Sequence, residues 1–230
     1  MLFFMLGWVM LIIAGVDEAG RGCVIGPLVV AGVVISKEMM SELTALDVKD
    51  SKLLTQKKRN TLFQEIIKIV PAFKTVKIPP VEIDKAVNCQ IPLHKLNRLE
   101  AKTMAQVIEG LHPDEVYVDA ADILEERFAT HIRECLTFNP KIISRHKADQ
   151  LYPIVSAASI IAKVTRDREI ELLKNEYGNI GSGYLHDEKT KTFLVEWLKN
   201  NKDYPKCVRK SWKPAKKALS ERDTAQQKLF

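Results

Sequence analysis

Residues 11–22 read LIIAGVDEAGRG and open the ordered pattern of this 230-residue chain. Their first half, residues 11–16, is an apolar run that stops at Asp17 and Glu18, and Gly20-Arg21-Gly22 follows at once. A short apolar run closed by glycines is typical of a buried strand that ends in a tight turn. The sheet therefore starts here, with two carboxylates at the end of its first strand.

The segments that follow alternate between strand and helix patterns. Residues 24–35 are rich in Val and Ile and predict a second strand, antiparallel to the first, with an irregularity at Gly26-Pro27. Helical spacing and brief apolar runs predict the other elements of this part: helices at 55–70, 92–111 and 123–136, and strands at 72–78, 115–118 and 141–144. Thr55 and Asp122 suit the N-cap positions of two of these helices.

Helices dominate after Pro153. The pattern predicts one helix at 153–177, a loop with three glycines at 178–183, another helix at 188–200 and a polar tail of helical character at 213–230. The fold class is therefore α/β, with a mixed β-sheet flanked by helices and a C-terminal helical subdomain. We expect a main domain at 11–177, a helical annex at 178–230 and an apolar N-terminal extension at 1–10.

Composition indicates an ordinary globular protein with a mild basic excess. Hydrophobic residues make up 46% and charged residues 28%, and the formal net charge is +6. This charge suits a polyanionic partner, although many basic proteins bind nothing acidic. The four cysteines are scattered without a C-x-x-C pair, which disfavours a disulfide framework or a zinc knuckle and favours a reducing, cytoplasmic setting.

The first 14 residues are almost wholly apolar and uncharged. They are too few for a membrane span, which needs roughly 20 apolar residues. They also lack the basic segment of a signal peptide. Three interpretations stay open: an ill-packed extension before the first strand, a true start at Met10, or a membrane anchor.

Carboxylates fall at the ends of three predicted strands. Asp17 and Glu18 close the first strand, Asp119 closes the strand at 115–118, and Asp149 follows the strand at 141–144. Such residues can meet at one edge of a sheet, where they repel each other unless a cation neutralises them. Divalent cations such as Mg²⁺ take oxygen ligands of this kind and support phosphodiester hydrolysis. The alternative is that each acid is a cap or a surface charge.

Several other residues suit contact with a phosphate or a sugar. Gly20 and Gly22 allow close approach to the backbone, and Arg21 can fork onto a phosphate, although a plain hairpin turn fits them as well. Ser156, Ser159, Lys163 and Arg166 share one face of the helix at 153–177, which suits phosphates or a solvated surface. Tyr184 in its glycine loop suits stacking on a sugar or base, or a partly buried anchor.

The chain resembles the ribonuclease HII family, and its archaeal members most. The matching segments are GVDEAGRG at 15–22, DSKL at 50–53, YVD at 117–119, KAD at 147–149, YPIVSAASIIAKV at 152–164 and GSGY at 181–184. They occur in the family's order from residue 15 to about residue 187. The first of these segments and the long run at 147–164 are highly specific, whereas the others would be weak alone.

The resemblance implies a ribonuclease H-like sheet on which Asp17, Glu18, Asp119 and Asp149 are catalytic and hold Mg²⁺ or Mn²⁺. It implies that Gly20, Arg21 and Gly22 read the 2′-hydroxyl through backbone contacts, assisted by Tyr184. We also expect substrate binding by Ser51 and Lys52 of the matching DSKL segment and by Lys163 and Arg166 on the polar face of the helix at 153–177. The implied substrates are RNA–DNA hybrids and single ribonucleotides in duplex DNA, cut 5′ of the ribonucleotide to leave a 3′-hydroxyl and a 5′-phosphate.

Two departures from the family pattern bear on these expectations. After Tyr184 the family commonly has Pro-Ser-Asp, whereas this chain has Leu185-His186-Asp187, which puts the positioning of the tyrosine in doubt. Residues 1–9 match no family segment. Residues 227–230 end in an apolar pair and resemble, only poorly, a peptide that binds a sliding clamp. Apart from such a partner, we expect a monomer that does not bind a membrane.

Three rival functions stay open at this point: a nuclease of the same broad fold that does not need a 2′-hydroxyl, a nucleic-acid-binding module with a degenerate site, and a membrane-peripheral protein. The presence of all four acids disfavours the second. Only the apolar N-terminus suggests the third.

Overall fold

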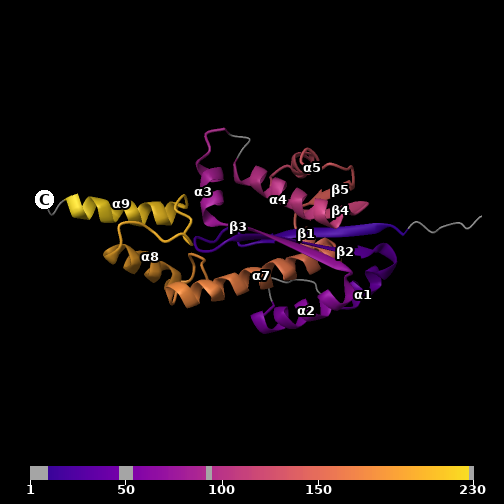
Figure 1. The fold of residues 1–230 in the computed structure, drawn as a ribbon, viewed down its shortest axis with the longest axis horizontal. Coiled ribbons are helices and arrows are strands. Elements are labelled where there is room, and N and C mark those ends of the chain that lie inside the picture. Colours follow the sequence, from indigo (N-terminus) through magenta and orange to yellow (C-terminus); the bar gives the residue numbers. More distant parts are fainter. Residues whose placement is uncertain (1–9, 47–53, 92–94, 228–230) are drawn as a thin grey trace, which may run out of the picture.

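The computed structural model describes residues 10–46, 54–91 and 95–227. Its centre is a five-stranded sheet of order β3-β2-β1-β4-β5, which confirms the mixed α/β class (Figure 1). β1 pairs antiparallel with β2 and parallel with β4. β3 extends the antiparallel side and β5 the parallel side. The strands are β1 (Ile12–Ala19), β2 (Leu28–Ser36), β3 (Ala72–Ile78), β4 (Glu115–Asp119) and β5 (Lys141–Arg145).

Helices cover both faces of this sheet, because successive side chains of a strand point to opposite sides. From β1, Ile13 packs among residues of α1 (Met40–Ala45), α2 (Gln56–Ile69) and α7 (Pro153–Tyr177). Its neighbours Ala14 and Val16 pack instead against α4 (Leu96–Leu111) and α5 (Glu125–Arg133). Figure 1 shows these two helical layers on either side of the sheet. The remaining short helices are η1 (Lys37–Met39), α3 (Pro80–Asn88) and α6 (Ala148–Leu151).

The long helix α7 lies unusually close to the central strand. A Cβ atom at Gly15 would stand 2.4 Å from the backbone carbonyl of Ile154, so this position excludes every side chain. The first half of α7, rich in Ser and Ala, is buried from Ile154 to Ala162. The close contact brings the polar groups of α7 against the end of β1.

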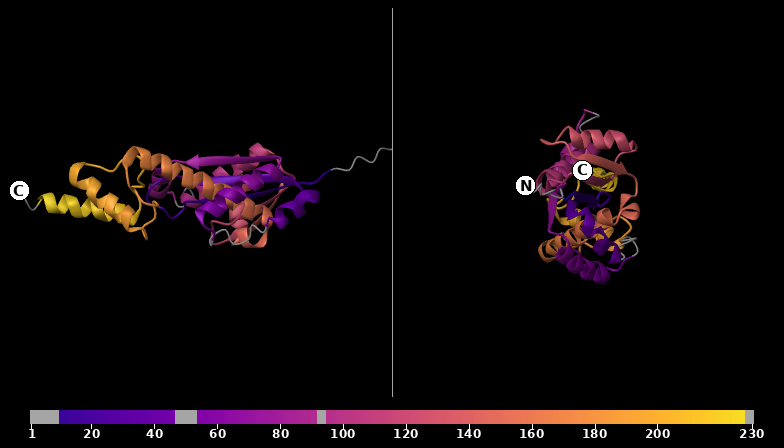
Figure 2. Two further views of the ribbon diagram at one scale, coloured as in Figure 1. Left: turned by 90° about the horizontal axis from the view of Figure 1, so that it is seen from below. Right: turned by 90° about the vertical axis from the view of Figure 1, so that its right-hand side faces the viewer.

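The C-terminal helices α8 (Glu188–Asn200) and α9 (Lys213–Gln227) form one end of an elongated molecule (Figure 2). They share a hydrophobic core with the end of α7 and with the segment between β1 and β2. Its buried members include Val24, Ile25, Ile170, Ile180 and Val208. The C-terminal part therefore packs directly on the chain that follows the central strand.

Most predicted elements are confirmed, and three with their predicted bounds: β3, α7 and α8. Thr55 is the N-cap of α2 as predicted, and its side chain accepts a hydrogen bond from the Lys58 amide. The second strand starts four residues later than predicted, at Leu28. Gly26 adopts a φ of +92° there, and Ile25 pairs with Val208 instead of with β1.

The prediction of Asp122 as an N-cap is wrong. The helix runs only over Glu125–Arg133, and its N-cap is Leu124, which is extended. Asp122 lies two residues earlier, where it accepts the Leu124 amide and forms an ion pair with Arg127. These contacts hold the pKa of Asp122 at about 2, against the opposing effect of burial. Asp122 thus stabilises the start of α5 although it lies outside the helix.

Other expectations concern the cysteines, the termini and the N-terminal stretch. All four cysteines, Cys23, Cys89, Cys135 and Cys207, are free thiols. Within the described ranges, no helix has the length and apolar character that crossing a membrane requires. Residues 1–9, the first part of the helix predicted at 92–111, and residues 228–230 lie outside the described residues.

Candidate active site

Three of the four acids lie at the carboxyl ends of the neighbouring parallel strands β1 and β4. Val16 is paired with Val118, so the next residues, Asp17 and Asp119, lie side by side. The fourth acid, Asp149, belongs to the first turn of α6. The Ala148 amide donates to Asp119 at 3.0 Å, which brings this helix to the end of β4. Asp149 is close enough to raise the pKa of Asp17. The structure therefore brings together the acids that the sequence placed at three strand ends.

Asp17 and Glu18 face opposite layers of the molecule. Asp17, only 4% exposed, accepts hydrogen bonds from the Ser159 hydroxyl of α7 and from the Glu18 amide. Glu18 points to the side of α4, where the buried Glu100 raises its pKa. The two carboxylates are thus held by different helices while they remain at one edge of the sheet.

Burial and mutual repulsion disfavour the charged forms of these acids. Burial, followed by the charge of Asp119, raises the pKa of Asp17 to about 7, while the Ser159 hydroxyl opposes this rise. Burial, followed by Asp17 and Glu100, raises the pKa of Glu18 well above its ordinary value. In the described part of the chain, Glu18 Oε2 is buried without a hydrogen-bond partner. A cation at this edge would relieve both penalties.

The oxygen donors of this cluster suit a hard divalent cation such as Mg²⁺ or Mn²⁺. Among the described residues, however, no three His, Cys, Asp or Glu side chains stand in a geometry that would hold an ion as they are. These carboxylates fit a divalent cation by their chemistry and by the buried oxygen Oε2 of Glu18, which is unpartnered within the described ranges.

A groove of about 700 Å³ adjoins the acids and collects most of the other predicted site residues. Its lining includes Glu18, Gly20, Arg21, Gly22, Arg59, Lys163, Arg166, Tyr184 and His186. Arg59 of α2 was not foreseen; it forms an ion pair with Asp167 of α7 at 2.8 Å. Ser51 and Lys52 lie outside the described residues. The groove thus combines a glycine turn, several cations and an aromatic ring beside the carboxylates.

The Arg21 side chain forms hydrogen bonds within the protein. Its guanidinium donates to Glu100 Oε1 and to Asn97 Oδ1, both at 2.8 Å, so much of the fork predicted for a phosphate is already used. Glu100 was missed in the sequence. It is fully buried, and burial raises its pKa to about 7 although Arg21 and Arg209 oppose this. Its position one turn from the apolar Leu96 and Met104 was the available signal.

The predicted polar face of α7 turns inward, not to solvent. Ser156 and Ser159 are buried, and Ser159 contacts Asp17. Arg166 is 5% exposed; it donates to the Ser182 carbonyl and lies over the Tyr184 ring at 4.5 Å. Lys163 is partly buried and lines the groove. Arg166 therefore holds the tyrosine loop as well as contributing charge.

The loop that carries Tyr184 is held without the family's proline. Gly183 has a φ of +82°, and its carbonyl accepts the amides of Val24 at 2.8 Å and Ile25 at 3.2 Å. Asp187 caps α8 and also accepts the Ser182 amide at 2.6 Å. The His186 ring stacks on Tyr184 with 5.4 Å between centroids. These contacts anchor the loop on both sides of the tyrosine.

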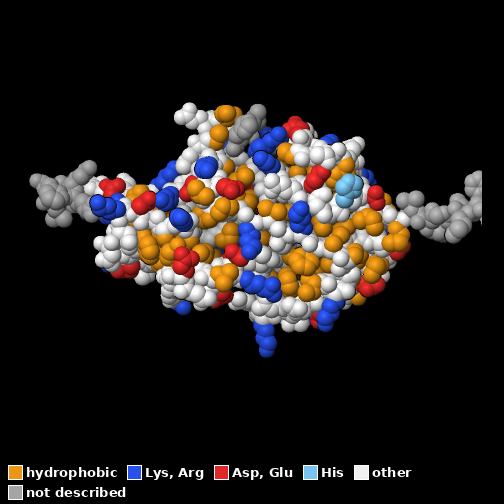
Figure 3. All heavy atoms as spheres, in the orientation of Figure 1, with side chains coloured by type: hydrophobic (Ala, Val, Ile, Leu, Met, Phe, Trp, Pro, Cys, Tyr) orange, Lys and Arg blue, Asp and Glu red, His pale blue; other side chains and the backbone are white. Residues whose placement is uncertain are grey.

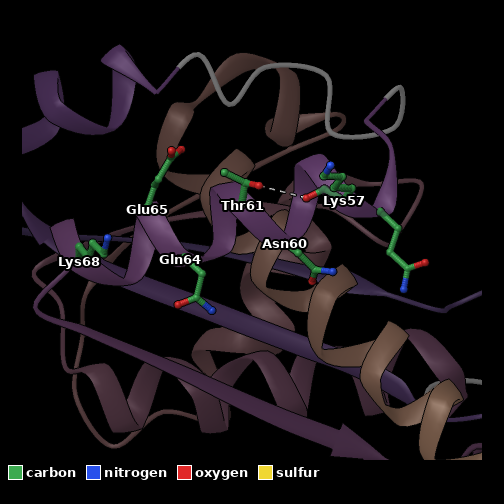
Figure 4. Close-up of a pocket in the computed structure, with 7 residues that line it drawn as sticks. Lys57, Asn60, Thr61, Gln64, Glu65 and Lys68 are labelled. Atoms are coloured by element: carbon green, nitrogen blue, oxygen red, sulfur yellow. Dashed lines mark hydrogen bonds between the residues drawn. The ribbon is translucent and has the colours of Figure 1, made fainter.

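A second hollow runs along the outer face of α2 and is shown in Figure 4. It is lined by Lys57, Asn60, Thr61 and other polar residues of that one helix. Thr61 donates its hydroxyl to the Lys57 carbonyl within the helix. Because no second element contributes converging groups, we take the groove beside the carboxylates as the candidate active site.

Comparison with known proteins gives a consistent result. The family profile described as ribonuclease HII matches residues 14–215. Ribonuclease HII of Thermococcus sibiricus is 50% identical over 207 residues, 89% of this chain and 90% of the relative. The crystal structure of ribonuclease H2 from Pyrococcus horikoshii OT3 is similar with a TM-score of 0.84 and 44% identity, covering 93% of this chain and 99% of that one. Ribonuclease HII from Archaeoglobus fulgidus, solved in a complex with PCNA, has a TM-score of 0.80 and 44% identity over 88% of this chain and 96% of that one.

Proposed function

This chain belongs to the ribonuclease HII family and is a metal-dependent endoribonuclease, and we propose that it hydrolyses the RNA strand of RNA–DNA hybrids and cuts 5′ of single ribonucleotides embedded in duplex DNA. The products are a 3′-hydroxyl and a 5′-phosphate. The observation that carries the proposal is the meeting of Asp17, Glu18, Asp119 and Asp149 beside a groove lined by a glycine turn and Tyr184. The family disfavours the three rival functions.

In the proposed two-metal-ion mechanism the four acids would hold Mg²⁺ or Mn²⁺, with Asp17 as the central ligand. Such ions, when bound, activate the attacking water and stabilise the leaving oxygen. Ser159 keeps Asp17 oriented, and its hydrogen bond favours the charged form of that carboxylate. With a cation bound, the repulsion among the carboxylates would be relieved and their ionised forms would be favoured.

The groove supplies the substrate contacts in this proposal. The backbone of Gly20, Arg21 and Gly22 approaches the ribose, and the Tyr184 ring stacks on the sugar next to the cut. Lys163, together with Arg166 at the groove wall, attracts phosphates. Ser51 and Lys52 are proposed as further substrate contacts. Residues 11–177 then form the catalytic part, and 178–230 the part that binds substrate.

Partner and location are proposed on narrower grounds. A sliding clamp is a proposed partner because the Archaeoglobus fulgidus relative was solved in a complex with PCNA. The proposed contact is at residues 227–230. We propose that the enzyme is otherwise a monomer and works in the cytoplasm, which the four free thiols favour.

The test is cleavage of a duplex that contains one ribonucleotide, with an RNA–DNA hybrid and an all-DNA duplex beside it, each with and without Mg²⁺. The wild type should cut only the ribonucleotide-containing substrates, and only with metal. Asp17→Asn should cut about 100-fold more slowly or worse while it still binds the hybrid, since loss of an outer partner of a metal ligand alone costs 10–100-fold.

The matched control is Asp114→Asn, the same chemical change at the other end of β1. Asp114 accepts the Ile12 amide there, at the strand's first residue. It should keep the wild-type rate. Wild-type turnover by Asp17→Asn, or cutting of all-DNA duplex by the wild type, would contradict the proposal.

A further inference from the structure

We propose that Arg209 is a positioning residue for substrate recognition: it binds the carbonyls of Gly20 and Arg21 so that the amides of Arg21 and Gly22 face the groove and donate to the ribose 2′-hydroxyl. This inference rests on the proposed function, because it states how the glycine turn reads its substrate. Arg209 lies 189 residues from Gly20 along the chain and outside every motif quoted for the family resemblance.

The contacts of Arg209 converge on the turn. The side chain is fully buried and donates to the carbonyls of Gly20 at 2.7 Å, Arg21 at 2.8 Å and Gly26 at 3.1 Å. It also donates to Cys23 Sγ at 3.0 Å. Its own amide donates to the Val24 carbonyl, so that the backbone holds the side chain in place. One guanidinium thus binds both ends of the segment from Gly20 to Gly26.

Among the described residues, Arg209 forms no ion pair, although Glu100 and Asp84 interact with its charge at longer range. Its charge is compensated by carbonyl dipoles, by the sulfur atom and by the Trp212 ring at 5.0 Å. A buried charge that forms no direct ion pair costs free energy unless hydrogen bonds satisfy it. The arrangement therefore makes the shape of the turn depend on Arg209.

The geometry of the peptide bond determines which way the amides of Arg21 and Gly22 point. In a trans peptide the C=O and the following N–H point in opposite directions, and the described chain has no cis peptide bond. When the carbonyls of Gly20 and Arg21 point inward to Arg209, the amides of Arg21 and Gly22 point outward. Neither amide donates to a backbone acceptor in the described ranges, and both residues are exposed and line the groove.

The two glycines show which side of the turn is open. Gly20 has a φ of +86°, and a Cβ there would stand 2.8 Å from the Pro27 carbonyl. A Cβ at Gly22 would meet nothing within 4 Å. The inner side is therefore filled, while the outer side leaves room for a sugar at the backbone. A cation bound to the carbonyls also polarises these peptides, which strengthens their amides as donors.

The test measures selectivity for ribose in binding, without cleavage. Dissociation constants are measured in EDTA for two duplexes of identical sequence, one with a single ribonucleotide and one with all DNA. Arg209→Met and Arg209→Lys should reduce the wild-type preference for the ribonucleotide by about tenfold or more, as expected for loss of well-placed donors. Affinity for all-DNA duplex should change much less.

Leu194→Ala is the matched control, because Leu194 is buried in the same C-terminal core and its apolar side chain forms no hydrogen bond to the carbonyls of the turn. It should lower stability and keep the preference. Circular dichroism and the thermal midpoint check folding of each variant. A folded Arg209 variant with the full wild-type preference would overturn the inference and leave the proposed function intact.

A measurement on the wild type covers the case in which both Arg209 variants fail to fold. The ¹⁵N-labelled protein is titrated in EDTA with each duplex. The amide signals of Arg21 and Gly22 should move with the ribonucleotide duplex and much less with all DNA. Equal movement with both duplexes, or none, would overturn the inference. Failure of the proposed function would look different, as a wild-type enzyme that cuts neither hybrid nor ribonucleotide duplex.

Discussion

At the scale of single residues, the site is made of groups that are unfavourable on their own. Asp17 and Glu18 carry raised pKa values, and Glu100 is buried beside them. Each is tolerated because a neighbour offsets part of the cost: Ser159 for Asp17, and Arg21 for both Glu18 and Glu100. Raised pKa values of buried carboxyl groups are expected where a protein binds a cation or catalyses a reaction.

This strain predicts a pH-dependent stability for the metal-free protein. The pKa of Asp17 is about 7 in the folded chain, against 3.8 as the ordinary value. Between about pH 4 and pH 7 the folded state keeps a proton that the unfolded state has lost, so stability falls as pH rises. Asp17→Asn should therefore raise the thermal midpoint of the metal-free protein at pH 7, and its advantage should shrink towards pH 4.

Thermal unfolding of both proteins in EDTA across this pH range measures the effect. Added Mg²⁺ should raise the midpoint of the wild type more than that of the variant, because only the wild type gains relief from repulsion. Equal midpoints at pH 7 in EDTA would show that Asp17 carries no such strain.

At the scale of elements, α7 organises both halves of the site. Its start presses on β1 at Gly15 and orients Asp17 through Ser159. Two turns further on, Arg166 binds the loop before α8 and lies over Tyr184. One rigid helix therefore sets the distance between the acids and the aromatic ring, and the loop needs no proline to hold its place.

This arrangement predicts distinct effects for two changes at Tyr184. Tyr184→Ala should slow cleavage at a single ribonucleotide about tenfold, because stacking of a base or sugar on an aromatic ring contributes roughly 1–3 kcal/mol. Tyr184→Phe keeps the ring and should retain most of the activity. Initial rates on the single-ribonucleotide duplex measure both. If both variants cut as fast as the wild type, the ring is not part of the site.

At the scale of the whole molecule, the C-terminal part is built into the active site as well as lying beside it. It covers Val24 and Ile25 and supplies Arg209 to the turn between β1 and β2. On the face shown in Figure 3, basic and acidic side chains are interspersed, so the net charge of +6 is not gathered there into one patch. That face therefore offers no single basic surface to a polyanion.

Removal of residues 178–230 should cost stability as well as substrate binding. Val24, Ile25 and Ile170 would lose their cover, and each buried side chain of this size contributes roughly 1.5–3 kcal/mol. A chain that ends at Tyr177 should lose cooperative thermal unfolding and bind a hydrophobic dye. If the shortened chain instead unfolds at the wild-type midpoint, the two parts are independent.

Many helices and strands of this protein, and the positions of its acids, could be predicted from the sequence alone. The elements β3, α7 and α8 follow from local periodicity and turn residues, and the acids could be assigned to strand ends because neighbouring parallel strands end at one edge. The family resemblance added their expected chemistry. Local pattern failed at Asp122 and at Gly26, where contacts with Arg127 and with Val208 outweigh the propensities of the segment.

Only the tertiary structure decided how Arg21 and the glycine turn are held. The bond from Arg21 to Glu100 spans 79 residues, and that from Arg209 to Gly20 spans 189. Sequence periodicity reports which face of an element is buried, but it carries no information about which distant segment arrives there. The contact depends on the path of the whole chain, because the buried charge of Arg209 is stable only where several carbonyl acceptors surround it.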